Sequence, residues 1–248
     1  MPLFDDAIGQ IRAYIREKEK NGKVRQMQAD AAPPWPAAGS RDIVLRRDTG
    51  LELGGPCAES FSLLLWTNDA RLVEDGRITS IGPDFTERAQ DWMPLGKIVI
   101  VCGADFDETN AYDRFVEMSL AAYEVSLKGY MMRTAYQDMH EWVRISTRAL
   151  ESGLGLHVAG RAVLDACKNN NYVKAAELVT VTSKNRDVKE LRDVSQDAVD
   201  YINAMRKMAE EMTFDCNTCQ YQSVCDGVSE LKAMAAVLEK RKQADGRR

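Results

Sequence analysis

The sequence predicts an α/β protein with a mixed sheet flanked by helices, an N-terminal helix and linker arm, and a C-terminal helical metal-binding segment. Short apolar runs bounded by turn residues alternate with longer amphipathic stretches, which is typical of strands and helices in one domain. Some strand-like runs lie close enough in sequence for hairpins, so we expect a mixed sheet. Three of the 6 cysteines cluster near the C-terminal end. We therefore divide the chain at residues 1–40, 41–212 and 213–248.

The overall composition is that of an ordinary globular protein. The chain has 248 residues, of which 45% are hydrophobic and 29% charged. Its net charge of −5 argues against general nucleic-acid binding, which depends on neutralising phosphates. The longest apolar runs are too short to cross a bilayer, and the N-terminal residues lack a secretory-signal pattern. We expect a cytoplasmic protein with no nucleic-acid or membrane partner.

The N-terminal arm begins with an expected amphipathic helix over residues 3–20. Phe4, Ile8, Ile11 and Ile15 fall on one face at helical spacing. This stripe could be covered by the chain's own domain or by a partner subunit, because periodicity alone does not identify what covers it. Residues 29–40 are rich in proline and predict an extended linker. We expect Trp35, in the linker, to fit a groove of this chain or of a neighbour.

The central region predicts alternating strands and helices. The expected strands are Ile43–Leu45, Phe61–Trp66, Ile78–Ile81, Lys97–Cys102 and Leu178–Thr182. The expected helices are Asp107–Gly129, His157–Asn169, Ser183–Met212 and, after the cysteine cluster, Gly227–Gln243. The chain has 2 histidines, neither in a hydrolase motif, and no general acid–base pair or nucleophile stands out. We therefore expect no catalytic residue in this chain alone.

The cysteine cluster has the spacing C-x2-C-x5-C and consists of Cys216, Cys219 and Cys225. In a reducing compartment, clustered cysteines are more often metal ligands than disulfides. Both a [4Fe–4S] cluster and a tetrahedral zinc site take four ligands. Cys57, in a Gly-Gly-Pro-Cys turn, is the best candidate for the fourth. Cys102 and Cys167 are expected to be buried as small hydrophobes. We favour [4Fe–4S], with zinc as the alternative.

Several short motifs occur together in a recognisable order. They are residues 51–56 (LELGGP), 73–84 (VEDGRITSIGPD), 129–133 (GYMMR) and 141–146 (EWVRIS). This set resembles the central domain of acetyl-CoA synthase, the beta subunit of the carbon monoxide dehydrogenase/acetyl-CoA synthase complex, over about residues 41–212. In that family a nickel-containing domain follows. Cys216 and Cys219 match its first cysteine pair, but Cys225 comes too early and the nickel ligands are missing. The resemblance therefore does not extend to nickel-based catalysis.

The resemblance implies a coenzyme A site at Arg133, Trp142 and Arg144. Arginine forks bind phosphates in a bidentate manner, and an indole can stack on adenine. The competing interpretation is that Trp142 packs in the core and the arginines are surface charges.

Three functional hypotheses follow. The first is a non-catalytic iron–sulfur subunit of a larger, anaerobic enzyme complex, which stabilises a partner subunit, relays electrons, or both. The second is a coenzyme A or acyl-CoA-binding accessory protein related to acetyl-CoA synthase. The third is a zinc-stapled assembly factor for metallocentres.

Overall fold

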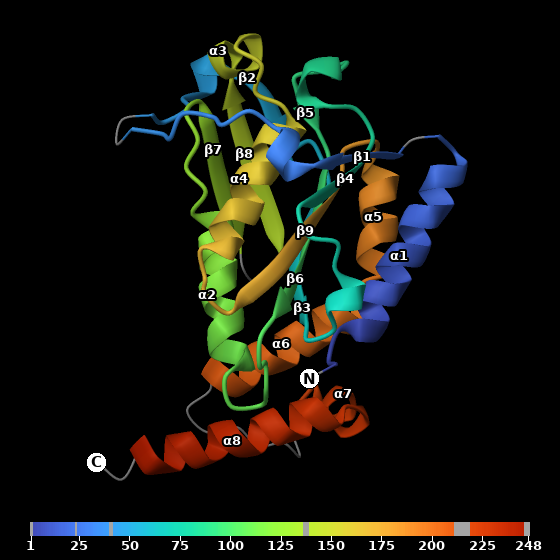
Figure 1. The fold of residues 1–248 in the computed structure, drawn as a ribbon, viewed down its shortest axis with the longest axis vertical. Coiled ribbons are helices and arrows are strands. Elements are labelled where there is room, and N and C mark those ends of the chain that lie inside the picture. Colours follow the sequence, from blue (N-terminus) through green and yellow to red (C-terminus); the bar gives the residue numbers. More distant parts are fainter. Residues whose placement is uncertain (1, 23, 40–41, 136–138, 211–218, 246–248) are drawn as a thin grey trace.

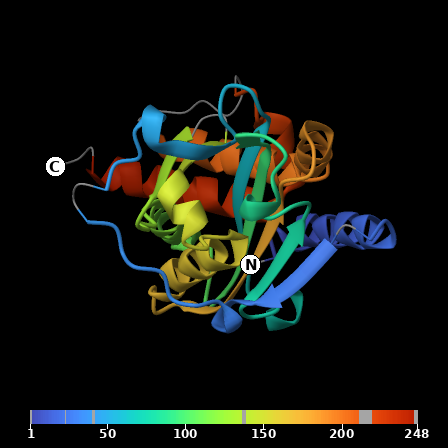
Figure 2. The same cartoon turned by 90° about the horizontal axis from the view of Figure 1, so that it is seen from above.

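The protein folds into two mixed sheets flanked by helices, which confirms the predicted class (Figure 1). This computed structural model describes residues 2–22, 24–39, 42–135, 139–210 and 219–245. The sequence indicated a single sheet, and the structure has a second one. Figure 2 shows the strands at the centre, with α1 (Asp5–Lys20) and α2 (Ala111–Tyr123) on opposite sides of them.

The larger sheet has 5 strands in the order β1-β4-β9-β6-β3. Its pairs β1/β4 and β6/β9 are antiparallel, whereas β4/β9 and β3/β6 are parallel. Every residue of β3 and β6 is buried, which explains why both strands read as continuous apolar runs. The strands are β1 (Val24–Gln28), β3 (Ser60–Thr67), β4 (Arg77–Ile81), β6 (Leu95–Gly103) and β9 (Val173–Val181).

The smaller sheet has 4 strands in the order β5-β2-β8-β7, and the sequence analysis missed it. Its strands are β2 (Thr49–Leu53), β5 (Trp92–Met93), β7 (Tyr130–Ala135) and β8 (His140–Ser146). In the sequence, apolar Val143 and Ile145 alternate with polar Arg144 and Ser146, and this alternation was the detectable signal of β8. The strand predicted at Ile43–Leu45 is wrong: this segment is irregular, and Ile43 and Leu45 are 65% and 47% exposed. Only Val44 of the three is buried, so the apolar run is not a sheet strand.

The helices predicted at His157–Asn169 and Gly227–Gln243 lie close to those of the structure, whereas the helix predicted at Asp107–Gly129 is too long, since α2 begins at Ala111 and ends at Tyr123. The helix expected over residues 183–212 is divided into α5 (Asn185–Asp193) and α6 (Gln196–Glu210). At the break, the buried Ser195 hydroxyl donates to the Leu191 carbonyl. The other α-helices are α3 (Thr147–Glu151), α4 (Leu156–Lys168), α7 (Gln222–Gly227) and α8 (Ser229–Asp245), and short 3-10 turns occur at Ala29–Ala31, Arg46–Asp48, Ala70–Leu72 and Phe85–Glu87. Among the described residues, no helix is both long and apolar enough to span a membrane.

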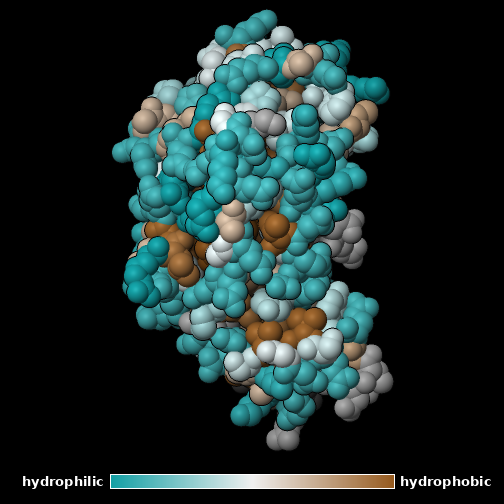
Figure 3. Space-filling model, turned by 90° about the vertical axis from the view of Figure 1, so that its right-hand side faces the viewer, coloured by the Kyte–Doolittle hydropathy of each residue, from teal (hydrophilic) through white to brown (hydrophobic). Residues whose placement is uncertain are grey.

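Helix α1 packs on its own domain, which answers the question that its apolar stripe left open. The stripe is buried in the main core, and the Phe4 ring meets the Trp66 ring edge-on at 4.5 Å between centroids. Lys18 Nζ lies 2.7 Å from the buried Asp187 carboxylate, and Arg12 pairs with Glu177. Figure 3 views the molecule from the side of α1 and α5, where the surface is mostly hydrophilic with small separate apolar patches.

Candidate functional site

The outer face of the smaller sheet carries the residues that the resemblance indicated. Along β8, the even-numbered residues Trp142 and Arg144 are half-buried, while the odd-numbered residues between and beside them are buried against the core. Arg133 on β7 lies directly opposite Trp142, and Glu52 on β2 lies opposite Arg144. Since side chains alternate across a strand and paired residues share a face, these four side chains lie on one surface.

Within this surface, two guanidinium groups lie over the Trp142 indole. The ring centroid is 4.6 Å from Arg144 Cζ and 5.8 Å from Arg133 Cζ, within the range of cation–π attraction. Arg144 also donates from Nε to Glu52 Oε1 at 2.9 Å. The structure therefore brings Arg133, Trp142 and Arg144 together as one cluster, which we call the Trp142 cluster. With two arginines and one glutamate, it carries a net positive charge suited to phosphate.

The turn after β2 passes close to Trp142 because it contains adjacent glycines. Gly54 has a φ of +59°, and a Cβ there would lie 2.4 Å from the Glu141 carbonyl oxygen. A Cβ on Gly55 would lie 2.9 Å from Trp142 Nε1. These glycines permit a close approach that larger residues would prevent. The Gly-Gly-Pro motif thus helps position the indole as well as form a turn.

The cysteines of the C-terminal segment are only partly described. Cys219 and Cys225 are half-buried, the first shortly before α7 and the second within it, and Cys216 lies outside the described residues. The backbone N–H of Tyr221 points at Cys219 Sγ, with 3.4 Å between nitrogen and sulfur. Such N–H···S bonds stabilise thiolate ligands and tune iron–sulfur clusters. Among the described residues, no group of three or more His, Cys, Asp or Glu side chains is arranged to hold a metal ion.

Cys57 is exposed, and within the described part of the chain it forms no metal-holding group with Cys219 and Cys225. It lies just before Ser60, the first residue of β3. Near the other end of β3, the Trp66 ring contacts Phe4, and Phe4 in turn contacts Tyr201 on α6. Helix α6 packs against α7, which contains Cys225. Six residues of strand separate Ser60 from Trp66, which corresponds to roughly 20 Å. Figure 1 likewise shows α7 and α8 at the end of the molecule away from β2. The structure thus does not bring Cys57 to Cys219 and Cys225.

The other two cysteines lie inside the core. Cys102 on β6 and Cys167 on α4 are 1% and 0% exposed. Burial raises the pKa of the Cys167 thiol to about 11, and burial also raises the pKa of Cys102. Both groups are therefore neutral thiols near pH 7 and behave as small hydrophobes.

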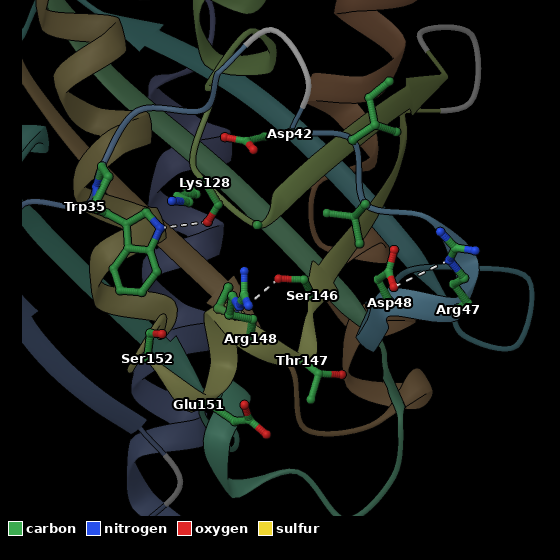
Figure 4. Close-up of a pocket in the computed structure, with 15 residues that line it drawn as sticks. Trp35, Asp42, Arg47, Asp48, Lys128, Ser146, Thr147, Arg148, Glu151 and Ser152 are labelled. Atoms are coloured by element: carbon green, nitrogen blue, oxygen red, sulfur yellow. Dashed lines mark hydrogen bonds and ion pairs between the residues drawn. The ribbon is translucent and has the colours of Figure 1, made fainter.

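A cavity of about 930 Å³ lies at the end of the smaller sheet, and sequence reasoning missed it (Figure 4). Its walls come from the linker and the segment after it, the start of β7, the end of β8, and α3. Trp35 is half-buried in its own chain, and its Nε1 donates to the Lys128 carbonyl oxygen at 2.8 Å. The walls of the cavity come from segments that are distant in sequence, so no local sequence pattern predicted it.

Comparison with known families identifies a related family. A family model described as CO dehydrogenase/acetyl-CoA synthase complex beta subunit matches residues 38–188, which is more than half of the chain. No curated protein matches the chain. The matched region includes the Trp142 cluster and Cys57, but neither α1 nor the C-terminal cysteines.

Proposed function

The chain belongs to the CO dehydrogenase/acetyl-CoA synthase complex beta subunit family, and from this we propose that it is a non-catalytic iron–sulfur subunit of a larger, anaerobic enzyme complex. The family's description is that of one subunit of a complex, which supports protein partners for this chain. The subunit would stabilise a partner, relay electrons, or both. We assign it no catalytic residue, because the reaction would belong to the assembled complex.

The observation that carries this proposal is the environment of Cys219. Its sulfur accepts a backbone N–H from Tyr221, and Cys225 lies nearby in a segment packed on α6 and α8. Three closely spaced thiolates, with Cys216 as the third, would supply three of the four ligands of a [4Fe–4S] cluster, which would provide electron transfer or cross-link the segment. A zinc-stapled assembly factor would use the same thiolates, so metal content separates the two.

The test is the metal content of protein purified anaerobically. We expect about four iron atoms per chain and a brown colour. Cys219→Ala and Cys225→Ala should each lose most of the iron, because each removes a ligand. Cys57→Ala is the matched control and should retain iron, since Cys57 forms no metal-holding group with Cys219 and Cys225 in the described part of the chain. A colourless protein with zinc would refute the iron–sulfur proposal. Loss of iron in Cys57→Ala would instead restore Cys57 as the fourth ligand.

Coenzyme A binding is a second candidate function, favoured by the Trp142 cluster. The indole and the guanidinium groups of Arg133 and Arg144 share one surface, where stacking on adenine and contacts to phosphates would be possible together. This would make the chain an accessory protein that holds coenzyme A or an acyl-CoA. Metal content does not test this candidate, so it needs its own measurement.

Calorimetric titration with coenzyme A tests this second candidate. We expect saturable binding that Trp142→Ala and Arg144→Ala each weaken by about tenfold or more, because stacking and charged hydrogen bonds contribute about 1–3 kcal/mol each. The matched control is Arg186→Ala, which removes an arginine that is 79% exposed and paired with Glu190 on α5. Absence of heat at millimolar ligand, or equal loss in the control, would eliminate the candidate.

A further inference from the structure

A second, much smaller cavity lies inside the protein, between the two sheets, and the functions proposed above make no use of it. Its volume is about 30 Å³. Residues of both sheets and of α4 line it, among them Leu53 and Tyr130 of the smaller sheet and Leu178 of the larger one. A cavity of this volume has room for one water molecule or a ligand of similar size. We call it the inter-sheet cavity.

Four polar side chains line the inter-sheet cavity, although its walls are otherwise mostly apolar. They are Lys97, Tyr130, Glu141 and Thr180, and none of these residues is more than 8% exposed. They come from four different strands, namely β6, β7, β8 and β9. Polar groups buried this deeply need hydrogen-bond partners inside the protein, because bulk water no longer solvates them.

Three of these side chains make only weak hydrogen bonds within the described part of the chain. Lys97 Nζ donates to Met132 Sδ at 3.9 Å, and the Tyr130 hydroxyl donates to the same sulfur at 4.0 Å. The Thr180 hydroxyl donates to the Thr79 carbonyl at 3.4 Å, which is longer than a normal hydrogen bond between oxygens. All three groups therefore have capacity for a further partner.

The carboxylate of Glu141 is the least satisfied of the four. Its Oε2 forms an ion pair with Lys97 Nζ, but the ammonium group approaches it outside hydrogen-bond geometry. Among the described residues, no group donates a hydrogen bond to this oxygen. A carboxylate oxygen has about two lone-pair sites, so the ion pair leaves room for a donor. A donor here would compensate for the solvation that burial removes.

The charges around the inter-sheet cavity favour a neutral ligand that both donates and accepts hydrogen bonds. Lys97 would repel a cation, and Glu141 would repel an anion. An apolar ligand would leave the polar groups unsatisfied. Water can donate to Glu141 Oε2 and accept from Lys97, Tyr130 or Thr180, and buried waters typically make about three hydrogen bonds.

We propose that the inter-sheet cavity binds one water molecule, which donates to Glu141 Oε2 and accepts from at least one of the other three polar side chains. Lys97 and Thr180 belong to the larger sheet, whereas Tyr130 and Glu141 belong to the smaller one. The water therefore links the two sheets. It also hydrates the buried Lys97–Glu141 ion pair, which no other solvent reaches. This inference depends neither on a metal centre nor on coenzyme A.

A crystal structure and oxygen-17 magnetic relaxation dispersion test this inference, since the first locates ordered waters and the second counts the long-lived internal ones. We expect crystals of the wild type to show one water at about 2.5–3.0 Å from Glu141 Oε2. Ala159→Val adds two methyl groups at the cavity wall, where Ala159 is 7% exposed. It should displace this water and lower the count by about one per chain. The matched control is Ala235→Val, on α8 and outside the cavity lining, which should keep the water.

The wild-type crystals decide the inference even if Ala159→Val fails to fold. Absence of electron density for a water beside Glu141 would overturn it, and so would the anomalous signal of a chloride ion at that place. Thr180→Val is a second variant, which removes one polar group from the cavity at nearly constant side-chain size. It should lower the occupancy of the water. Unchanged density in both Ala159→Val and Thr180→Val would show that the inter-sheet cavity does not hold this water.

Discussion

Replacing Lys97 with methionine is expected to lower the free energy of unfolding by about 3–5 kcal/mol. Lys97 on β6 forms an ion pair with Glu141 on β8, and the two side chains are only 6% and 1% exposed. The pair therefore joins the two sheets inside the protein. Removing the lysine leaves a buried carboxylate without its counter-ion, which is far more costly than losing a surface pair. Urea unfolding followed by circular dichroism measures the change.

Two control variants sharpen this prediction. The double variant Lys97→Met/Glu141→Gln should recover much of the loss, because no buried charge remains unpaired. Lys189→Met removes the lysine of an exposed pair with Glu59, where the lysine side chain is 60% exposed. It should cost no more than about 1 kcal/mol. A Lys97→Met loss as small as that of Lys189→Met would show that the buried pair does not join the sheets energetically.

Replacing Phe4 with alanine is expected to cost about 3–5 kcal/mol, the usual range for a large buried aromatic residue. Phe4 is 0% exposed and contacts the Trp66 and Tyr201 rings at centroid distances of 4.5 and 6.3 Å. The substitution leaves a cavity where α1 meets β3 and α6. The same unfolding measurement on the isolated chain reports the loss.

The Phe4→Ala result also tests the role of the N-terminal helix. Leu120→Ala is the matched control, because Leu120 on α2 is 46% exposed, and the loss should stay within about 1 kcal/mol. If α1 were mainly a docking helix for a partner, Phe4→Ala would affect the isolated chain no more than this control. A large loss would mean that α1 is part of the core.

Local patterns predicted the elements whose environment is uniform along their length. β3 and β6 are buried on both faces, so their continuous apolar runs identified them without knowledge of their partners. The apolar stripe of α1 likewise follows from helical spacing. Ile43–Leu45 has a similar apolar composition but pairs with no strand, and composition alone could not separate the two cases. At the division between α5 and α6 the Ser195 N–H donates to the Arg192 carbonyl, three residues back, while the apolar period continues across it.

The candidate sites were predictable only in part. Arg133, Trp142 and Arg144 were named from a family resemblance, but their meeting on one surface depends on the register of β7, β8 and β2. Cys57 was the reasonable fourth ligand from sequence because its turn is flexible. The described residues do not group it with Cys219 and Cys225, and Cys216 lies outside them, so its role as fourth ligand stays a prediction. The cavity beside Trp35 had no signal at all, since its walls come from segments far apart along the chain.

By itself, the sequence determined the fold class, the apolar stripe of α1, the family resemblance and the identity of the thiol groups near the C-terminus. These properties follow from residue type and short-range periodicity, which act over a few neighbouring residues. Only the tertiary structure decided the second sheet, the domain that covers α1, the position of Cys57 and the cavity. These features depend on strand register and on contacts between distant segments. A side chain becomes buried only when other segments pack against it, so one segment alone does not determine burial.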